Sequence, residues 1–259
     1  MSHPTNPQGN DEVWRLDPGR QLLSDAISYT RKADGFIAML VMMDKAQALC
    51  HEYRNQGQPM TLTPIVVRAC ALALRNHPWV HCMRRGRKVV RPAQIEIGVS
   101  VASQEAVTPV VIIKRPDQKT LVEVANELRE GARKAKEDEQ KHLARMQLWG
   151  HLIPWFIRRL MVRCFMHSQR GRRFLAGTFQ ISSLAGEGVE FGIPFVLTTT
   201  TLLSIGRAAL RPVVVDGKVE PRLCAYLTIA ADHRLVDGTR AWAFMAEVKS
   251  LLENPQVLK

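Results

Sequence analysis

A histidine and an aspartate stand four residues apart near the end of the chain, in the heptapeptide from Asp232 to Gly238. A neutral imidazole with a pKa of about 6.5 can accept a proton near pH 7 when its other ring nitrogen is held by a hydrogen bond. Asp237 is placed to orient the ring of His233, or to brace the turn by pairing with an arginine. Because these residues are common in turns, an ordinary strand-end histidine beside an ordinary turn aspartate is the alternative interpretation.

The segments on either side of the heptapeptide indicate how His233 is held. Residues 223–231 are apolar and β-branched, which predicts a buried strand. Residues 239–252 predict a helix with Thr239 as its N-cap, because apolar residues recur there every three or four positions. The apolar residues of that helix are Ala241, Phe244, Met245, Val248, Leu251 and Leu252. His233 is therefore expected in a tight turn closed by Gly238, where a rigid scaffold presents a reactive side chain.

Six pieces of sequence, the heptapeptide among them, keep one order and spacing through the C-terminal half of the chain. They are residues 177–184, 205–207, 211–219, 226–229, 232–238 and 251–255. Together they resemble the catalytic domain of the acyltransferase subunits of 2-oxo acid dehydrogenase complexes, to which the chloramphenicol acetyltransferases are more distantly related. Residues 62–74 and 97–102 resemble the same domain more loosely. The resemblance covers about residues 15–258, with one interruption.

This resemblance implies an α/β fold of two layers (α+β), the coenzyme A-dependent acyltransferase fold, with a mixed sheet and flanking helices. It implies that His233 is the general base that removes a thiol proton. Ser182 would donate its hydroxyl to the oxyanion, with Ser183 in that role if the register differs by one residue. Asp237 would hold the turn and its electrostatics, and Gly238 would give the backbone room. The chain is thus expected to be an acyltransferase that uses coenzyme A or acyl-coenzyme A as a substrate.

The resemblance also implies a homotrimer whose active site lies between subunits, with the histidine turn facing the serine of a neighbour. Coenzyme A would enter one end of a channel and the acyl partner the other. Larger cubic assemblies of trimers are left open. An arginine near the start of the family's domain anchors the active-site aspartate, so Arg20 is the candidate partner of Asp237. The residues that contact coenzyme A are not identified by the sequence, and no metal site is predicted.

Length and composition are those of a globular chain. Its 259 residues fit a flexible N-terminal lead-in, residues 1–14, and one catalytic domain, residues 15–259. The net charge of +12 favours acidic partners: anionic lipid, an acidic carrier protein or a phosphate-bearing cofactor. Nucleic acid is disfavoured, because aromatic residues make up only 6% and no nucleic-acid motif is present. Five unpaired cysteines predict buried free thiols, with a nucleophilic cysteine as the alternative, and together with a polar N-terminus that has no apolar signal core they favour a cytoplasmic protein.

Lys45 stands between an aspartate and an alanine, as lipoylated lysines do. A lipoyl lysine needs the tip of a hairpin in a small all-β domain, whereas residues 46–53 predict a helix. No other segment predicts a lipoyl domain, and no hinge rich in Pro and Ala is present. The sequence therefore predicts no covalent lipoyl group on this chain, and a separate lipoyl or acyl carrier protein as a partner.

A basic, amphipathic insertion interrupts the family pattern at about residues 141–174. Residues 141–173 hold eight Lys or Arg and no Asp or Glu. Apolar side chains fill one half of a helix there, while Arg158, Arg159 and Arg163 fall on the other half. The helix would pack on the protein's own core or at a subunit contact, or it would dock on an anionic membrane surface, an acidic carrier or a lipid-like substrate.

Other elements follow from periodicity and turn chemistry. Strands are predicted at residues 36–43, 95–101, 107–114 and 198–201, helices at 20–31, 63–76 and 121–142, and hairpins at 86–92 and around Asp216-Gly217. Thr198 to Thr201 stand where the family often has a polar stretch with proline beside its active site. Two other functions are alternatives to the enzyme: a non-catalytic scaffold that keeps the trimeric core, and an antibiotic O-acetyltransferase.

Overall fold

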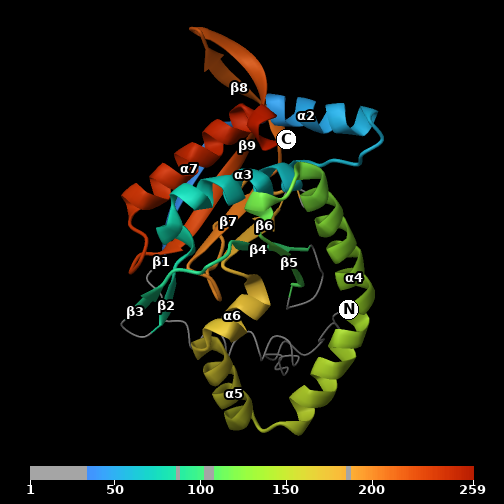
Figure 1. Cartoon of the computed structure of the whole chain (residues 1–259), viewed down its shortest axis with the longest axis vertical. Coiled ribbons are helices and arrows are strands. Elements are labelled where there is room, and N and C mark those ends of the chain that lie inside the picture. The colour runs from blue at the N-terminus through green and yellow to red at the C-terminus, as the bar shows by residue number, and fades with distance from the viewer. Residues whose placement is uncertain (1–33, 86–87, 102–107, 185–187) are drawn as a thin grey trace, which may run out of the picture.

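A computed structural model describes residues 34–85, 88–101, 108–184 and 188–259. Its centre is a seven-stranded mixed sheet in the order β1-β9-β7-β6-β4-β5, with β8 paired to β9 (Figure 1). The strands are β1 (Asp34–Met42), β4 (Glu96–Ser100), β5 (Val110–Lys114), β6 (Phe179–Ser183), β7 (Thr201–Ile205), β8 (Ala209–Val215) and β9 (Lys218–Asp232). β6 runs parallel to β4 and β7, and the other pairs are antiparallel. The mixed sheet with flanking helices that the sequence predicted is confirmed.

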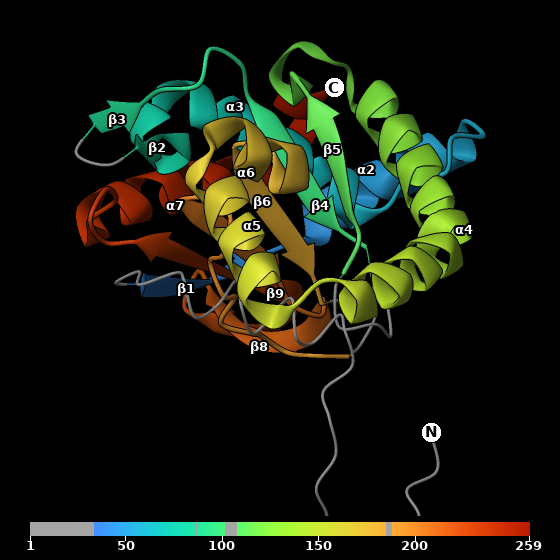
Figure 2. The same cartoon turned by 90° about the horizontal axis from the view of Figure 1, so that it is seen from below.

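One face of this sheet carries the hydrophobic core. Alternate residues of the central strands, such as Phe179, Ile181 and Ile229, are fully buried against the helices α3 (Leu62–Asn76) and α7 (Gly238–Glu253). The rings of Phe179 on β6 and Phe244 on α7 meet at 5.5 Å between centroids. The period-two burial of the strands and the apolar stripes of the helices thus produce two layers, as Figure 2 shows.

The remaining helices lie around the sheet. α2 (Asp44–Asn55) follows β1, and α4 (Leu121–Leu152), α5 (Trp155–His167) and α6 (Gln169–Ala176) connect β5 to β6. The short helices η1 (Pro78–His81), η2 (Pro116–Gln118) and η4 (Pro255–Leu258) and the hairpin of β2 (Met83–Arg85) and β3 (Lys88–Val90) complete the described elements. The predicted helix at 20–31 and the lead-in lie outside the described residues. Lys45 lies in the first turn of α2, where its Nζ donates to Asn254 Oδ1 at 2.9 Å, and not at a hairpin tip.

The β8–β9 hairpin has the predicted turn and extends beyond the body of the molecule (Figure 1). Asp216 and Gly217 have φ of 50° and 77°, the left-handed values that a two-residue type I′ turn requires. Three apolar side chains of the hairpin, Leu210, Val214 and Val219, are 73%, 69% and 71% exposed. The hairpin therefore shows apolar surface that nothing in the described chain covers.

The insertion forms helices, but its apolar side is not packed on the described core. α4 continues to Leu152, so the prediction that it ends near residue 142 was wrong. In α5, Trp155, Phe156 and Leu160 are 65%, 57% and 59% exposed, and Met166 is the buried residue. This contradicts packing against the core of its own chain and leaves the subunit contact and the anionic surface as alternatives. Every helix among the described residues is too short or too polar to cross a membrane.

The threonine run differs from its prediction as a strand. Only Thr201 lies in β7, while Thr198 to Thr200 form bends before it. The hydroxyls of Thr200 and Thr201 donate to the carbonyls of Cys82 and Val80, at the end of η1. Buried threonines that satisfy main-chain carbonyls in this way compete with regular strand pairing. The run therefore joins η1 to the start of β7.

Four of the five cysteines, Cys50, Cys70, Cys82 and Cys224, are buried free thiols as predicted. Burial raises the pKa of Cys50 to about 11 and raises that of Cys70 further, which suppresses the reactive thiolate. Cys164 is exposed on α5, so the prediction of burial was wrong for this residue. The reason is that α5 presents its apolar side outward.

His81, at the end of η1, is a buried histidine that sequence reasoning did not single out. It is 3% exposed and its Nδ1 has no hydrogen-bond partner in the part of the chain that is described. Burial, together with the charge of Arg91, lowers the pKa of His81 to about 4. Because an unfolded chain would hold this proton near a pKa of 6.5, protonation between these values favours unfolding.

We therefore expect acid to destabilise the fold through His81. The pKa difference corresponds to a loss on the order of 3 kcal/mol in the free energy of unfolding as the pH falls from about 6.5 to about 4. Urea unfolding at several pH values measures it, with His81→Gln as the control that removes the titrating group. Equal pH slopes for the wild type and His81→Gln would contradict the assignment.

Candidate active site

The turn that carries His233 is anchored at both ends. β9 ends at Asp232, whose carbonyl accepts hydrogen bonds from the main-chain N–H of Leu235 at 2.9 Å and of Val236 at 3.1 Å. The side chains of Leu235 and Val236 are buried in the main core. The turn is thus fixed by main-chain hydrogen bonds and by two apolar side chains that follow the histidine.

Asp232 is the buried ionic partner within this turn. Its carboxylate accepts from Arg234 Nε at 2.8 Å and from Arg234 Nη2 at 2.6 Å, and its main-chain N–H donates to Thr200 O at 2.9 Å. Asp232 is 3% exposed, so this two-point pair satisfies a carboxylate that would otherwise be costly to bury. Sequence reasoning gave Asp232 no role; the bordering strand and the adjacent arginine were the available signals.

Asp237 is the N-cap of α7. Its Oδ1 accepts from the main-chain N–H of Arg240 at 2.9 Å, and the Arg240 guanidinium lies 3.7 Å away. The prediction of Thr239 as N-cap was therefore wrong: the helix begins at Gly238, one residue after the cap. Arg20, the predicted partner of Asp237, lies outside the described residues, so that pairing stays a prediction.

Arg240 connects the cap to the neighbouring η1. Its Nη1 donates to Leu235 O at 3.1 Å, and its guanidinium lies over the ring of Trp79 at 4.5 Å from the centroid. These contacts hold the C-terminal part of the turn, in addition to the Asp232–Arg234 pair at its start. An added Cβ at Gly238 would meet no described atom within 4 Å, so the room at this glycine faces open space in the single chain.

The imidazole of His233 is exposed, and within the described chain no hydrogen-bond partner holds either of its ring nitrogens. Its closest approach to another strand is at Gly35 of β1, where an added Cβ would lie 3.1 Å from the imidazole Cδ2. The ring therefore lies close to the main chain of Gly35, and no described residue bonds its nitrogens.

Ser182 lies in a row of hydroxyls that crosses the sheet on the face away from α3 and α7. The row consists of Ser100, Ser182, Ser204 and Thr228, each opposite the next in register. Ser204 donates to Gly192 O at 2.9 Å, while Thr228 Oγ1 is buried without a partner among the described residues. Ser183 alternates to the other face, so Ser182 and Ser183 cannot serve the same space.

His233 and Ser182 are far apart within one chain. Ser182 is level with Thr228, five residues before His233 on β9, and lies two strands away. At about 3.3 Å per residue and about 4.8 Å per strand, the two side chains are separated by roughly 20 Å. A single chain therefore does not bring the predicted base and the predicted oxyanion donor together.

Comparison with known proteins identifies the same family that the pieces of sequence around residues 232–238 resemble. Residues 28–148 and 158–259 match the family model of the 2-oxoacid dehydrogenase acyltransferase catalytic domain, and the gap falls within the basic insertion. The chain is 27% identical over 237 residues to the dihydrolipoyllysine-residue acetyltransferase component of the acetoin cleaving system of Bacillus subtilis, which covers 91% of this chain and 51% of that protein. The pyruvate dehydrogenase acetyltransferase component of Staphylococcus epidermidis is 26% identical, covering 97% of this chain and 54% of that protein. The chain thus spans about half the length of these relatives.

Solved structures show the same fold. The dihydrolipoamide acetyltransferase of Azotobacter vinelandii matches with a TM-score of 0.73 at 22% identity, covering 100% of this chain and 99% of that one. A probable dihydrolipoamide acetyltransferase of Listeria monocytogenes matches with a TM-score of 0.71 at 20% identity, covering 95% of each chain. The expected acyltransferase fold is therefore confirmed.

The cap of α7 allows a direct test of which residue begins the helix. We expect Asp237→Ala to lower the free energy of unfolding by about 1 kcal/mol, because the Arg240 main-chain N–H loses its acceptor. Thr239→Ala is the matched control and should leave stability within about 0.5 kcal/mol of wild type. Chemical denaturation measures both, and a larger loss for Thr239→Ala would return the cap to that residue.

Proposed function

The chain belongs to the family of 2-oxoacid dehydrogenase acyltransferase catalytic domains, and on that premise we propose that it transfers an acyl group between coenzyme A and a second thiol. The observation that carries the proposal is His233: a base at the family's motif position, on a turn fixed from both sides, with its ring exposed. A second thiol would be a dihydrolipoyl group or a carrier-protein thiol. Lys45 of α2 is not its attachment site in this proposal, because a helix cannot present a lipoyl lysine as a hairpin tip does.

The proposed reaction is a thioester exchange without net proton change. His233 accepts the proton of the attacking thiol, and the sulfur forms a bond to the carbonyl carbon of the acyl thioester. Ser182 donates its hydroxyl to the oxyanion of the tetrahedral intermediate. Collapse of the intermediate breaks the original carbon–sulfur bond, and the leaving thiolate takes the proton back from His233.

This mechanism requires Ser182 to come from another subunit, because roughly 20 Å separates it from His233 in one chain. Exposed apolar surface near the hydroxyl row supports such a contact. Phe191, Ile193 and Phe195 are 53%, 55% and 51% exposed in the segment whose Gly192 carbonyl binds Ser204. Large apolar side chains at this density are typical of subunit interfaces, so we propose the homotrimer of the family.

The proposed function first predicts the effect of removing each of the two catalytic side chains. His233→Ala should lower the rate of acyl transfer by about 10²–10⁴, and Ser182→Ala by about 10²–10³. Ser183→Ala is the matched control with little effect, because its side chain lies on the other face of the sheet. Mass spectrometry of acyl-dihydrolipoamide formed from a panel of acyl-coenzyme A donors measures the rates.

Wild-type rates for His233→Ala would contradict the proposed base, and an effect of Ser183→Ala without one of Ser182→Ala would shift the oxyanion donor by one residue. A chain that forms trimers but transfers no acyl group from any donor would favour the non-catalytic scaffold. Transfer to chloramphenicol in place of a thiol would favour the O-acetyltransferase.

The second prediction tests whether the site is shared between subunits. Trimers assembled from His233→Ala and Ser182→Ala chains in equal amounts should recover activity, because about a quarter of the interfaces then combine an intact histidine with an intact serine. Each variant alone should stay inactive. Mixed trimers as inactive as the separate variants would place both residues in the same subunit's site.

A further inference from the structure

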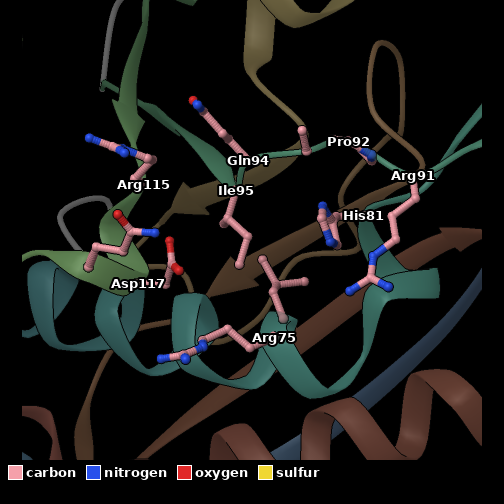
Figure 3. A pocket seen from close by; sticks show the side chains of 11 residues that line it. Arg75, His81, Arg91, Pro92, Gln94, Ile95, Arg115 and Asp117 are labelled. Atoms are coloured by element: carbon pink, nitrogen blue, oxygen red, sulfur yellow. The ribbon is translucent and has the colours of Figure 1, made fainter.

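A cavity of about 440 Å³ opens between the C-terminal end of α3, the end of η1 and the residues around η2 (Figure 3). This volume is in the range of sites for small molecules. Its lining includes the apolar residues Leu74, Pro92 and Ile95, and its polar side chains come from three separate parts of the chain. The cavity lies apart from the hydroxyl row of Ser182, which is on the other face of the sheet.

Three arginines line the cavity: Arg75 from the last turn of α3, Arg91 after β3, and Arg115 before η2. No side-chain hydrogen bond or ion pair to another described residue engages any of the three guanidinium groups. The main chain of Arg115 is nevertheless fixed, because its N–H donates to Ile95 O at 2.8 Å and its carbonyl accepts from Gln118 N–H at 3.0 Å. Three exposed arginines thus stand at separate edges of one cavity, with Arg91 beside His81 in Figure 3, and no described carboxylate is bonded to them.

The single carboxylate in the lining does not neutralise this charge. Burial lowers the pKa of Arg68 on α3, and the charge of Asp117 opposes this effect. Arg68 Nη1 also donates to Pro116 O at 3.0 Å. One aspartate therefore stands against three arginines in the lining. Such an excess of guanidinium groups is typical of sites that bind phosphate, because each planar fork can donate two hydrogen bonds to its oxygens.

His81 adds a second, independent sign of a ligand. His81 is only 3% exposed, and it lines the cavity. Its Nδ1 has no hydrogen-bond partner in the described chain. Figure 3 shows its ring beside Arg91, with Ile95 between these two residues and Asp117. An orphaned ring nitrogen in a native interior is uncommon and indicates an absent hydrogen-bonding group. A ligand oxygen would supply the missing partner.

We propose that this cavity is a binding site for a small phosphate ester or diphosphate, held by Arg75, Arg91, Arg115 and His81. The phosphate oxygens accept hydrogen bonds from the guanidinium groups and from the histidine ring, and the apolar floor receives the organic part of the molecule. Gln94 and Gln118 at the rim supply amide groups for its polar substituents. The site does not depend on the acyl-transfer function and makes no use of His233.

Isothermal titration calorimetry with inorganic pyrophosphate, and separately with ADP, tests the proposal on the whole protein. We expect one bound pyrophosphate per chain, with affinity lowered about tenfold or more in Arg75→Gln, Arg91→Gln and Arg115→Gln, because each removes one charged fork. Arg159→Gln is the matched control: this arginine is also exposed but lies on α5, far along the chain, and should leave affinity unchanged. Tighter binding of ADP than of pyrophosphate would place the organic part on the apolar floor.

A second readout follows His81 itself by nuclear magnetic resonance. Pyrophosphate should raise the pKa of His81, because an anion among Arg75, Arg91, Arg115 and Asp117 favours the imidazolium. A double variant that carries both Arg91→Gln and Arg75→Gln should lose both this pKa shift of His81 and the heat of binding. Circular dichroism checks that the double variant stays folded. Binding that persists unchanged in that double variant, or no binding by the wild type, would overturn the proposal, and equal weakening of all variants including Arg159→Gln would reduce it to unspecific attraction by the net charge.

Discussion

The pairing of β9 is the constraint on which the rest of the structure depends. Its fifteen residues are hydrogen-bonded to β8, then to β1 and β7, so its end at Asp232 cannot shift without breaking the register of the sheet. The next residue is His233, and Asp237, four positions further on, caps a helix that packs on the same core. The position of the His233 ring, although the ring is exposed on a turn, is therefore fixed by a strand in the middle of the sheet.

The same sheet keeps the serine away from the histidine. Ser182 is half-buried on the face of the sheet away from α3 and α7, and an apolar segment with exposed Phe191 and Phe195 borders that face. Closing such a face with a second copy of the chain would bury the apolar residues and bring the missing group to His233 in one step. The same contact between chains would then bury the exposed apolar side chains and complete the catalytic site, in which a single chain keeps His233 and Ser182 apart.

The sequence predicted the central elements because their patterns are local. The apolar, β-branched run of 223–231, the Asp216-Gly217 turn and the apolar stripe of α7 each depend on neighbours within a few residues, and each is confirmed. What failed depends on partners distant in sequence. Thr200 and Thr201 donate to the carbonyls of Cys82 and Val80, which lie more than a hundred residues away in the sequence. Packing of the insertion helix on the chain's own core was one of the predicted alternatives, and the exposed apolar side of α5 contradicts it. Asp237 and Thr239 are both good N-caps, and only the geometry of the turn decides between them.

The threonine run also gives a physical reason for the departure from the family's polar and proline stretch. Thr200 binds the main chain at both ends: its hydroxyl donates to Cys82 O and its carbonyl accepts from Asp232 N–H. Cys82 directly follows His81, so the floor of the arginine-lined cavity and the base of the histidine turn are connected through one residue. A proline in that position would lack the hydroxyl, and the link would be lost. The run therefore links the end of η1 to the base of the turn that carries His233 through two hydrogen bonds of Thr200.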